Sequence, residues 1–349
     1  MKAIAYDREA VVLAMTRIVS RTLDMDMTWD WPCAVAFYGI AEAYRVTGNA
    51  DYMEAMRSRV DELAKLGLPK LSVNSCAMGH CLLALYEATG SDAYQQIARQ
   101  MAEYLRTQVP RFGEGVLQHT VGADASFPGQ AWADTLFMAA LFMLRAGVLW
   151  QDDSLINDAL NQYVWHIRYL QDQGTGLWYH GYDSVSGGNM SAVYWGRANA
   201  WAAYTMAKAG KVLPECYLYP QYMDLAGSLN EQLSALKKYQ TDNGLWRTIV
   251  NDAESYEEVS ATCGIAAAMT LKHNPLHIRY IDKALAGVLG NIQPNGRVCN
   301  VSGGTAVMRD AQGYRGITRA WPQGWGQGLA LAFLAAVLES DSLNTDGAL

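Results

Sequence analysis

The stretch GRANAWAAYTMAKA, residues 196–209, is apolar on nearly every side of the helix that it predicts. A helix without a continuous polar face is normally buried on all sides in a large protein. The chain has 349 residues, of which 51% are hydrophobic, so it is long and apolar enough to enclose such a helix. The stretch therefore predicts an inner helix of an all-helical core.

Five other segments share this pattern, in which a loop with Gly, Trp or Pro leads into a helix rich in Ala, Leu and aromatic residues. They are WPCAVAFYGIAEAY from Trp31, GHCLLALYEA from Gly79, ADTLFMAALFML from Ala133, ATCGIAAAMTL from Ala261 and GWGQGLALAFLAAV from Gly324. More amphipathic helices, such as residues 51–66 and 92–108, lie between them. Six alternations of inner and outer helix predict an all-α fold, an (α/α)6 barrel, with a linear helical solenoid as the competing layout. Because no linker or low-complexity segment interrupts the chain, we expect one domain over residues 1–349.

The inner helices are expected to run parallel, so their N-termini converge on one face of the barrel. The segments GVLQHT, GLWYHGYD and GLWRTIV predict short β-hairpin loops at this rim. Aromatic and polar side chains occupy the loops that precede the inner helices: Trp29, Trp31, Asn74, Trp132, Trp195, Arg197 and Trp325. This combination predicts a binding pocket at the rim.

Composition argues against several classes of protein. The net charge is −7 without any basic block, so nucleic acid and anionic membranes are poor partner candidates. No apolar run reaches the roughly 18 residues of a membrane span, and charged residues 7–9 interrupt any signal peptide. The six Cys form no CxxC pair, which favours free thiols in a reducing compartment, and we expect a cytoplasmic protein. Phosphate-loop, dinucleotide and HExxH motifs are absent, and the six His suggest no metal set.

Asp134 is the most informative acid, since it stands directly before an apolar run that reaches Leu144. One interpretation is a helix cap or first-turn acid, which the helix dipole favours. The other is a general acid whose pKa is raised by aromatic surroundings. A helix N-terminus opposes such a rise in pKa, so the residues alone leave both interpretations open.

Three further residues are candidates. His180 lies among aromatic residues in GLWYHGYD and is either structural or functional. Arg197 follows Trp195 and suits a carboxylate ligand, although it could instead pair with a structural acid such as Asp134 or Asp183. Asn74, in VNSCAMGH, is either a plain helix cap or a pocket residue.

The motifs WADTLFM, GLWYHGYD and WGRANAW, in that order within a six-repeat helical chain, resemble glycoside hydrolase family 105. These are the unsaturated rhamnogalacturonyl hydrolases, relatives of the unsaturated glucuronyl hydrolases of family 88. The resemblance extends from WDWPCAVAFYG to GWGQGLALAF. It implies an (α/α)6 barrel and a hydrolase of pectin degradation. Such an enzyme releases a 4,5-unsaturated uronic acid, commonly from rhamnose, at the non-reducing end of lyase-derived oligosaccharides.

The resemblance also implies roles for individual residues. Asp134 would hydrate the enol-ether double bond, first as acid and then as base, without a metal or an organic cofactor. The implied substrate-binding residues are Trp31, Asn74, His180, Trp195, Arg197, Trp201 and Trp325. His180 and Arg197 would line the uronate subsite, whereas the tryptophans would supply stacking walls and rim contacts. Residues 123–127 match a substrate-contacting loop by position only.

One departure concerns Asn74, because the family usually has a second Asp at that place. Asn can hydrogen-bond a sugar hydroxyl but cannot titrate. This keeps a second class of function open, a non-catalytic or altered glycan-binding toroid. A sugar 2-epimerase is a further alternative, but it needs two His bases facing each other across the pocket. We expect either a monomer or a homodimer.

Overall fold

The computed structural model describes residues 4–122 and 127–346. Four of the inner helices begin at the first residue of their apolar repeat, and most residues of the inner helices are buried. They are α2 (Trp31–Thr47), α5 (Gly79–Thr89), α7 (Phe142–Trp150), α9 (Gly196–Val212), α11 (Val259–Leu271) and α14 (Gly324–Asp346). The outer helices are α1 (Arg8–Leu23), α3 (Ala50–Lys65), α6 (Asp92–Thr107), α8 (Asp153–Leu170), α10 (Tyr222–Leu236) and α12 (Ile278–Leu289).

The inner helices close into a ring, because the last of them, α14, packs along the first, α2. Two glycines allow this contact. A Cβ atom on Gly328 would lie 1.9 Å from the carbonyl oxygen of Val35, and one on Gly39 would lie 2.4 Å from that of Gly328. Only residues without a side chain permit backbones to approach so closely. The chain is therefore an (α/α)6 barrel and not a linear solenoid.

Polar pairs cross the interior of this ring between α2 and α9. The hydroxyl oxygens of Tyr38 and Tyr204 are 2.7 Å apart, and one turn further Lys208 Nζ lies 2.7 Å from Glu42 Oε2. All four side chains are buried. Since their residue numbers differ by four on each helix, the two pairs fix the mutual register of α2 and α9.

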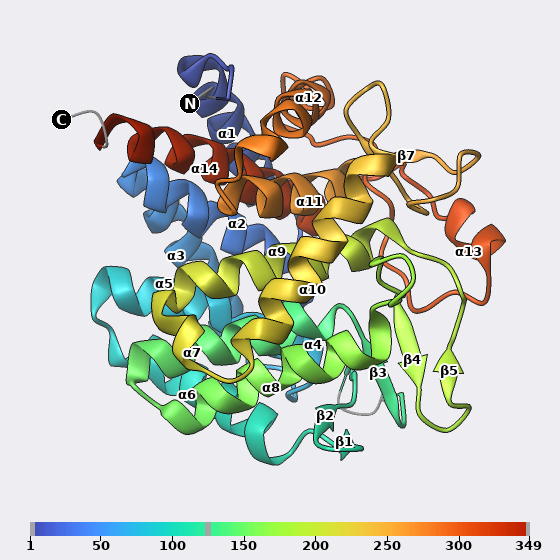
Figure 1. Cartoon of the computed structure of the whole chain (residues 1–349). Coiled ribbons are helices and arrows are strands. Elements are labelled where there is room, and N and C mark those ends of the chain that lie inside the picture. The colour runs from blue at the N-terminus through green and yellow to red at the C-terminus, as the bar shows by residue number, and fades with distance from the viewer. Residues whose placement is uncertain (1–3, 123–126, 347–349) are drawn as a thin grey trace.

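Short strands form hairpins on the side of the molecule away from the C-terminus of α14 (Figure 1). They are β1 (Arg111–Phe112), β2 (Val116–Leu117), β3 (Gln130–Trp132), β4 (Gly181–Asp183), β5 (Gly188–Asn189), β6 (Trp246–Arg247) and β7 (Glu257–Glu258). The strands arise within or beside the three segments that predict hairpins. Short helices complete the chain: α4 (Val73–Cys76), α13 (Ala311–Arg315), the π-helical η1 (Leu136–Leu141) and the 3-10 helices η2 (Pro214–Leu218), η3 (Lys237–Tyr239) and η4 (Pro275–His277).

The structure bears on the expectations of free cysteine thiols and of a chain without membrane spans. All six cysteines are free thiols, and five of them are buried. Within the described part of the chain, no helix combines the length and the apolar character that crossing a membrane requires.

Candidate functional site

Asp134 lies between β3 and η1, where the third inner helix begins. Its backbone carbonyl accepts hydrogen bonds from the amides of Phe137 and Met138, so the main chain already turns into the helix. Its carboxylate caps no backbone amide among the described residues, and the helix begins as a π-helical turn, a form that is frequent at functional sites. The side chain of Asp134 is therefore not a helix cap, and its partner lies elsewhere.

That partner is His180, which precedes β4. The antiparallel register pairs Trp132 with Gly181, and the amide of Ala133 donates to the carbonyl of His180 over 2.9 Å. This pairing places the imidazole beside the carboxylate, with 3.1 Å between His180 Nε2 and Asp134 Oδ2. His180 is fully buried, whereas the Asp134 side chain keeps 15% of its surface exposed. The carboxylate thus has the imidazole on one side and keeps a partly exposed surface elsewhere.

Tyr314, in α13, holds the opposite edge of the imidazole. Its hydroxyl lies 2.8 Å from His180 Nδ1 and accepts a hydrogen bond from the amide of Met308 over 3.2 Å. Because the Met308 amide already donates to this oxygen, the tyrosine proton is available to Nδ1. The arrangement favours the neutral tautomer with its proton on Nε2, the ring nitrogen that lies near Asp134. Nothing in the sequence around Tyr314 indicated this role.

The electrostatics of the pair favour an ionised acid and a neutral base. Burial raises the pKa of Asp134, but the attraction of His180 and its hydrogen bond outweigh that effect, and the pKa falls below its ordinary value. His119 and Arg197 act in the same direction. Burial lowers the pKa of His180 more than Asp134 raises it. No second carboxylate is among the main groups that act on Asp134, in agreement with Asn74 in place of an acid.

His119 flanks the site from the strand side and was not among the sequence candidates. Its Nδ1 atom lies 2.9 Å from Thr135 Oγ1, and its ring stacks on Trp132 with 4.3 Å between centroids. Burial lowers its pKa to about 4. The only signal in the sequence is its position in GVLQHT, one of the predicted rim hairpins.

Arg197 lies in the first turn of α9 and is almost completely buried. Its guanidinium donates to the hydroxyl and carbonyl of Ser302 (2.7 and 3.1 Å) and to the carbonyl of Gly303 (2.8 Å). Its nearest carboxylate is Glu258, 3.8 Å away. The alternative of a structural acid as partner is therefore met by Glu258 and not by Asp134 or Asp183. Long-range contacts with a later loop, which no local pattern reveals, decide the partner.

Glu258 anchors this arrangement from the start of α11. Its carboxylate accepts hydrogen bonds from the amides of Ala261 (2.5 Å) and Ser302 (2.8 Å) and from the Ser260 hydroxyl. The side chain is 1% exposed. Glu258 therefore ties the Ser302 loop to α11 and keeps the carbonyls that hold Arg197 in place.

A series of aromatic rings in contact extends from His180 toward the rim. Trp195 lies 4.1 Å from the His180 ring and 4.4 Å from the Arg197 guanidinium, which also faces Trp325 at 5.3 Å. Trp325 in turn stacks on the half-buried Trp31, with 4.4 Å between centroids. The structure thus brings five predicted substrate-binding residues, Trp31, His180, Trp195, Arg197 and Trp325, into one connected group with Asp134.

The other two predicted residues take no part in this series of ring and guanidinium contacts. Trp201 is fully buried one turn further along α9, where its ring lies 5.1 Å from that of Phe137. Asn74 lies in α4, which packs against η1. Its Oδ1 atom is buried and has no hydrogen-bond partner among the described residues, so it is available to a ligand or water. The capping role next to it belongs to Ser72, which accepts from the Ser75 amide.

The loop before β3 is described only in part. Residues 123–126 lie outside the described residues, so the match to a substrate-contacting loop is not tested there. Phe127, the last residue of that stretch, lies 4.5 Å from the Trp132 ring. Across the part of the chain that is described, no cluster of three or more His, Cys, Asp and Glu side chains could hold a metal ion.

Comparison with known proteins places this geometry in context. The family described as Glycosyl Hydrolase Family 88 matches residues 8–340. The unsaturated rhamnogalacturonyl hydrolase YesR of Bacillus subtilis (strain 168) is 49% identical over 341 residues, which cover 97% of this chain and 98% of that protein.

Solved structures agree with the fold. A possible member of the GH105 family from Salmonella enterica serovar Paratyphi A superimposes with a TM-score of 0.89 at 26% identity, covering 97% of this chain and 96% of that one. The unsaturated glucuronyl hydrolase from Bacillus sp. GL1 superimposes with a TM-score of 0.70 at 17% identity, covering 94% and 96%. The second likeness shows the barrel fold alone.

Proposed function

Since the chain belongs to glycosyl hydrolase family 88, we propose that it releases a 4,5-unsaturated uronic acid from the non-reducing end of lyase-derived oligosaccharides. The preferred substrate is unsaturated galacturonyl-rhamnose, which the similarity to YesR supports. The observation that carries the proposal is the single partly exposed carboxylate of Asp134 against the buried imidazole of His180. One carboxyl group that alternates between acid and base is what hydration of an enol ether needs.

The first step is protonation of the double bond. The protonated Asp134 gives its proton to C4 of the unsaturated sugar, so that its O–H bond breaks and a C4–H bond forms. The π electrons of the double bond form the new bond, and positive charge develops at C5, shared with the ring oxygen. The carboxylate that remains on Asp134 stabilises this charge.

The second step is addition of water. The Asp134 carboxylate takes a proton from a water molecule as the water oxygen bonds to C5, which regenerates the acid form. The resulting hemiketal opens, and C1 then releases the neighbouring sugar as an alcohol. The net reaction consumes one water molecule and uses no electrons from elsewhere.

Binding of the substrate favours the protonated form of Asp134. In the free protein the pKa of Asp134 is lowered, mainly because His180 offsets the effect of burial. A uronate carboxylate bound beside it adds a like charge and excludes water, and both effects raise the pKa of Asp134. The same binding event that positions C4 therefore favours the acid form.

The remaining residues bind the sugar. We assign the uronate subsite to His180 and Arg197, whose guanidinium is held by the carbonyls of Ser302 and Gly303. The half-buried ring of Trp31, stacked on Trp325, offers an apolar face to a sugar ring. Asn74 offers a free amide oxygen to a hydroxyl. The ring of Trp201 is fully buried and packs against Phe137, so it does not offer a stacking face to a sugar.

The test is incubation with an unsaturated rhamnogalacturonan disaccharide, with loss of the ultraviolet absorbance of the conjugated double bond as the measurement. Unsaturated glycosaminoglycan disaccharides serve as the comparison panel. Binding without loss of absorbance on any member would favour the glycan-binding alternative. His119 gives little support to an epimerase, because it is hydrogen-bonded to Thr135 and stacked on Trp132 and so does not present a second free base.

We also propose a cytoplasmic location. The support is the set of six free thiols, which an oxidising compartment would expose to disulfide formation during folding. Fractionation of the native host, followed by immunodetection, tests this assignment.

A further inference from the structure

The third inner helix has an irregular start, directly after Asp134. The π-helical turn η1 leads into α7, which continues the helix from Phe142. A π-helical turn interrupts the regular ladder of main-chain hydrogen bonds, and a carbonyl at such an interruption needs another donor. Loss of the one extra residue in this turn would move Asp134 by about 1.5 Å along the helix axis and about 100° around it, relative to α7. The position of Asp134 therefore depends on what holds η1.

His80, in the first turn of α5, supplies a donor to this turn. Its Nε2 atom lies 2.9 Å from the carbonyl oxygen of Phe137, the second residue of η1. Since a carbonyl oxygen only accepts, Nε2 carries the proton. The amide of Phe137 in turn donates to the carbonyl of Asp134 over 3.0 Å. A single residue, Phe137, thus connects His80 to the main chain of Asp134.

Arg145 fixes the tautomer of His80 from the other edge of the ring. Its Nη1 atom lies 3.0 Å from His80 Nδ1 and donates to the His80 carbonyl over 3.2 Å. A guanidinium only donates, so Nδ1 is the acceptor and the ring proton stays on Nε2. Arg145 belongs to α7, the continuation of η1. The imidazole therefore bridges two positions of the same inner helix.

The surroundings of His80 keep the ring neutral and fixed. The side chain is fully buried, and its ring lies 4.8 Å from that of Phe137, 5.2 Å from that of Tyr38 and 5.9 Å from that of Phe142. Burial, together with the charge of Arg145, lowers the pKa of His80 to about 3. His80 is therefore an uncharged donor in neutral solution, and the proposed reaction does not use it as an acid or a base.

We propose that His80 is a positioning residue, which together with Arg145 holds the π-helical turn in the form that keeps the Asp134 carboxylate beside His180. The inference rests on the proposed role of Asp134 in the reaction. Without the donor, η1 loses this support and the 3.1 Å contact between Asp134 and His180 is lost. Turnover then falls, because the acid no longer lies at C4.

Binding and acid-base behaviour should respond differently to this loss. The uronate subsite that we assign to Arg197 lies on α9 and the ring of Trp31 lies on α2, so substrate binding should change little. His180 is the main group that lowers the pKa of Asp134. Separation of the two side chains should therefore raise the pKa of Asp134.

The test compares two substitutions of His80. His80→Phe keeps a flat ring but has no donor, and it is expected to lower kcat at least about tenfold with KM within about twofold of the wild type. The alkaline limb of its kcat/KM profile should move to higher pH. His80→Gln, whose amide can still donate to the Phe137 carbonyl, should keep most of the activity and the wild-type pH profile. Loss of stability alone would not move the pH profile.

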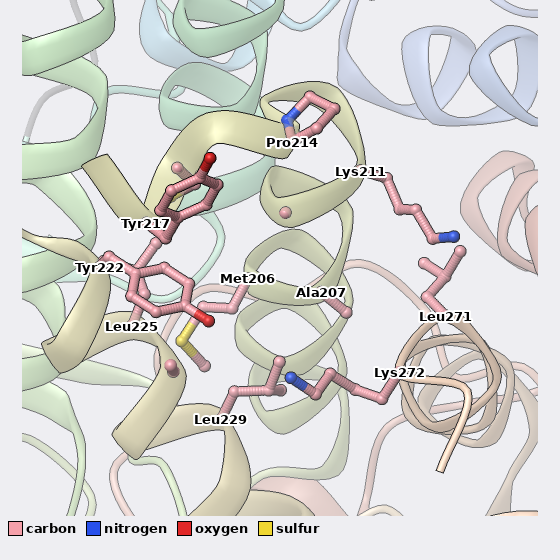
Figure 2. A pocket seen from close by; sticks show the side chains of 13 residues that line it. Met206, Ala207, Lys211, Pro214, Tyr217, Tyr222, Leu225, Leu229, Leu271 and Lys272 are labelled. Atoms are coloured by element: carbon pink, nitrogen blue, oxygen red, sulfur yellow. The ribbon is translucent and has the colours of Figure 1, made fainter. Parts of the chain in front are cut away.

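His277 offers a matched control at the other end of the inner helices. Its Nδ1 atom lies 3.2 Å from the carbonyl of Met269, in the last turn of α11, and its side chain is buried. Figure 2 shows Leu271 of that turn beside a crevice that Lys211 also lines. Lys211 is in the last turn of α9, whereas Arg197 is in its first turn. His277→Phe should therefore leave kcat and the pH profile unchanged.

An NMR titration of the isotope-labelled Asp134 carboxyl needs no turnover, so it separates this inference from the proposed function. A raised pKa of Asp134 in His80→Phe supports the inference. A wild-type protein that leaves every unsaturated uronide intact would overturn the proposed function alone. Arg145→Leu, which removes the donor to Nδ1, should shift the titration in the same direction and replaces His80→Phe if that variant does not fold. Unchanged turnover and titration in these variants would overturn the inference, as would equal effects of His80→Phe and His277→Phe.

Discussion

His180 Nε2 lies 3.1 Å from Asp134 Oδ2, while His180 Nδ1 lies 2.8 Å from the hydroxyl of Tyr314. The imidazole is thus held at both edges, and only one edge faces the carboxylate. This relationship makes the acid-base properties of Asp134 depend on a residue that is 180 positions along the chain from it (residue 314 against residue 134). The predictions below follow from that arrangement and from the buried charges of the barrel.

Asp134→Asn is expected to reduce kcat/KM at least about a hundredfold, because an amide can neither protonate C4 nor take a proton from water. The measurement is the rate of absorbance loss with the unsaturated disaccharide. The melting temperature should stay near that of the wild type, since the carboxylate caps no helix. Full activity in this variant would remove Asp134 from the mechanism.

Tyr314→Phe is expected to move the alkaline limb of the kcat/KM profile to lower pH. Loss of the hydroxyl removes a hydrogen bond to neutral His180, worth about 1 kcal/mol, so the pKa of His180 rises. A more easily protonated His180 stabilises the Asp134 carboxylate and depletes the acid form.

The matched control for this change is Tyr163→Phe. Tyr163 is as buried as Tyr314, and the substitution removes its hydrogen bond to the Thr205 carbonyl. It should leave the pH profile unchanged. Identical profiles for wild type and Tyr314→Phe would mean that Tyr314 only fills space.

Asn74→Asp is expected to have the opposite effect on pH dependence. A second carboxylate on α4, which packs against η1, opposes ionisation of Asp134 and raises its pKa. The alkaline limb should therefore move to higher pH, measured in the same assay. Asn74→Ala separates this effect from loss of the amide, because it removes the hydrogen-bonding group without adding charge.

Acid should destabilise the protein between about pH 6.5 and pH 4. Burial lowers the pKa of His80 to about 3, and that of His119 and His166 to about 4. The unfolded chain binds more protons than the folded one in this window, so stability is full above the unfolded pKa and falls as pH decreases. Each such histidine contributes up to about 1.4 kcal/mol per pH unit.

Denaturant unfolding across this range measures the effect. His166→Gln should flatten the slope of stability against pH, whereas His273→Gln, at an exposed position, should change it much less. Equal slopes in wild type and His166→Gln would contradict the assignment of a buried neutral His166.

Lys208→Met is expected to lower the free energy of unfolding by about 3 kcal/mol, since it leaves the buried carboxylate of Glu42 without its closest partner. Arg45, 3.0 Å from the same carboxylate, limits the loss. Adding Glu42→Gln should recover part of the stability, as measured by chemical unfolding. An unchanged stability in the single variant would show that the pair is not important to the barrel.

The amino-acid sequence by itself determined the architecture of this protein and its family. Six all-apolar segments can satisfy their hydrophobic surface only when they are enclosed, and alternation with amphipathic helices supplies the enclosing layer. Patterns of this kind are local, so they can be recognised without coordinates. The motifs around Asp134, His180 and Arg197 then indicated the family. That the chain forms a single domain and that it needs no cofactor remain predictions.

Only the tertiary structure decided which groups surround the candidate residues. Local pattern left Asp134 between cap and catalyst. It also could not find the acid nearest Arg197, because Glu258 is 61 residues away along the chain (residue 258 against residue 197). Strand pairing brings His180 to Asp134, and the loop after α12 brings Tyr314 and Ser302. The pKa of a buried group depends on every charge within a few ångströms, and those neighbours come from segments that meet only when the ring closes.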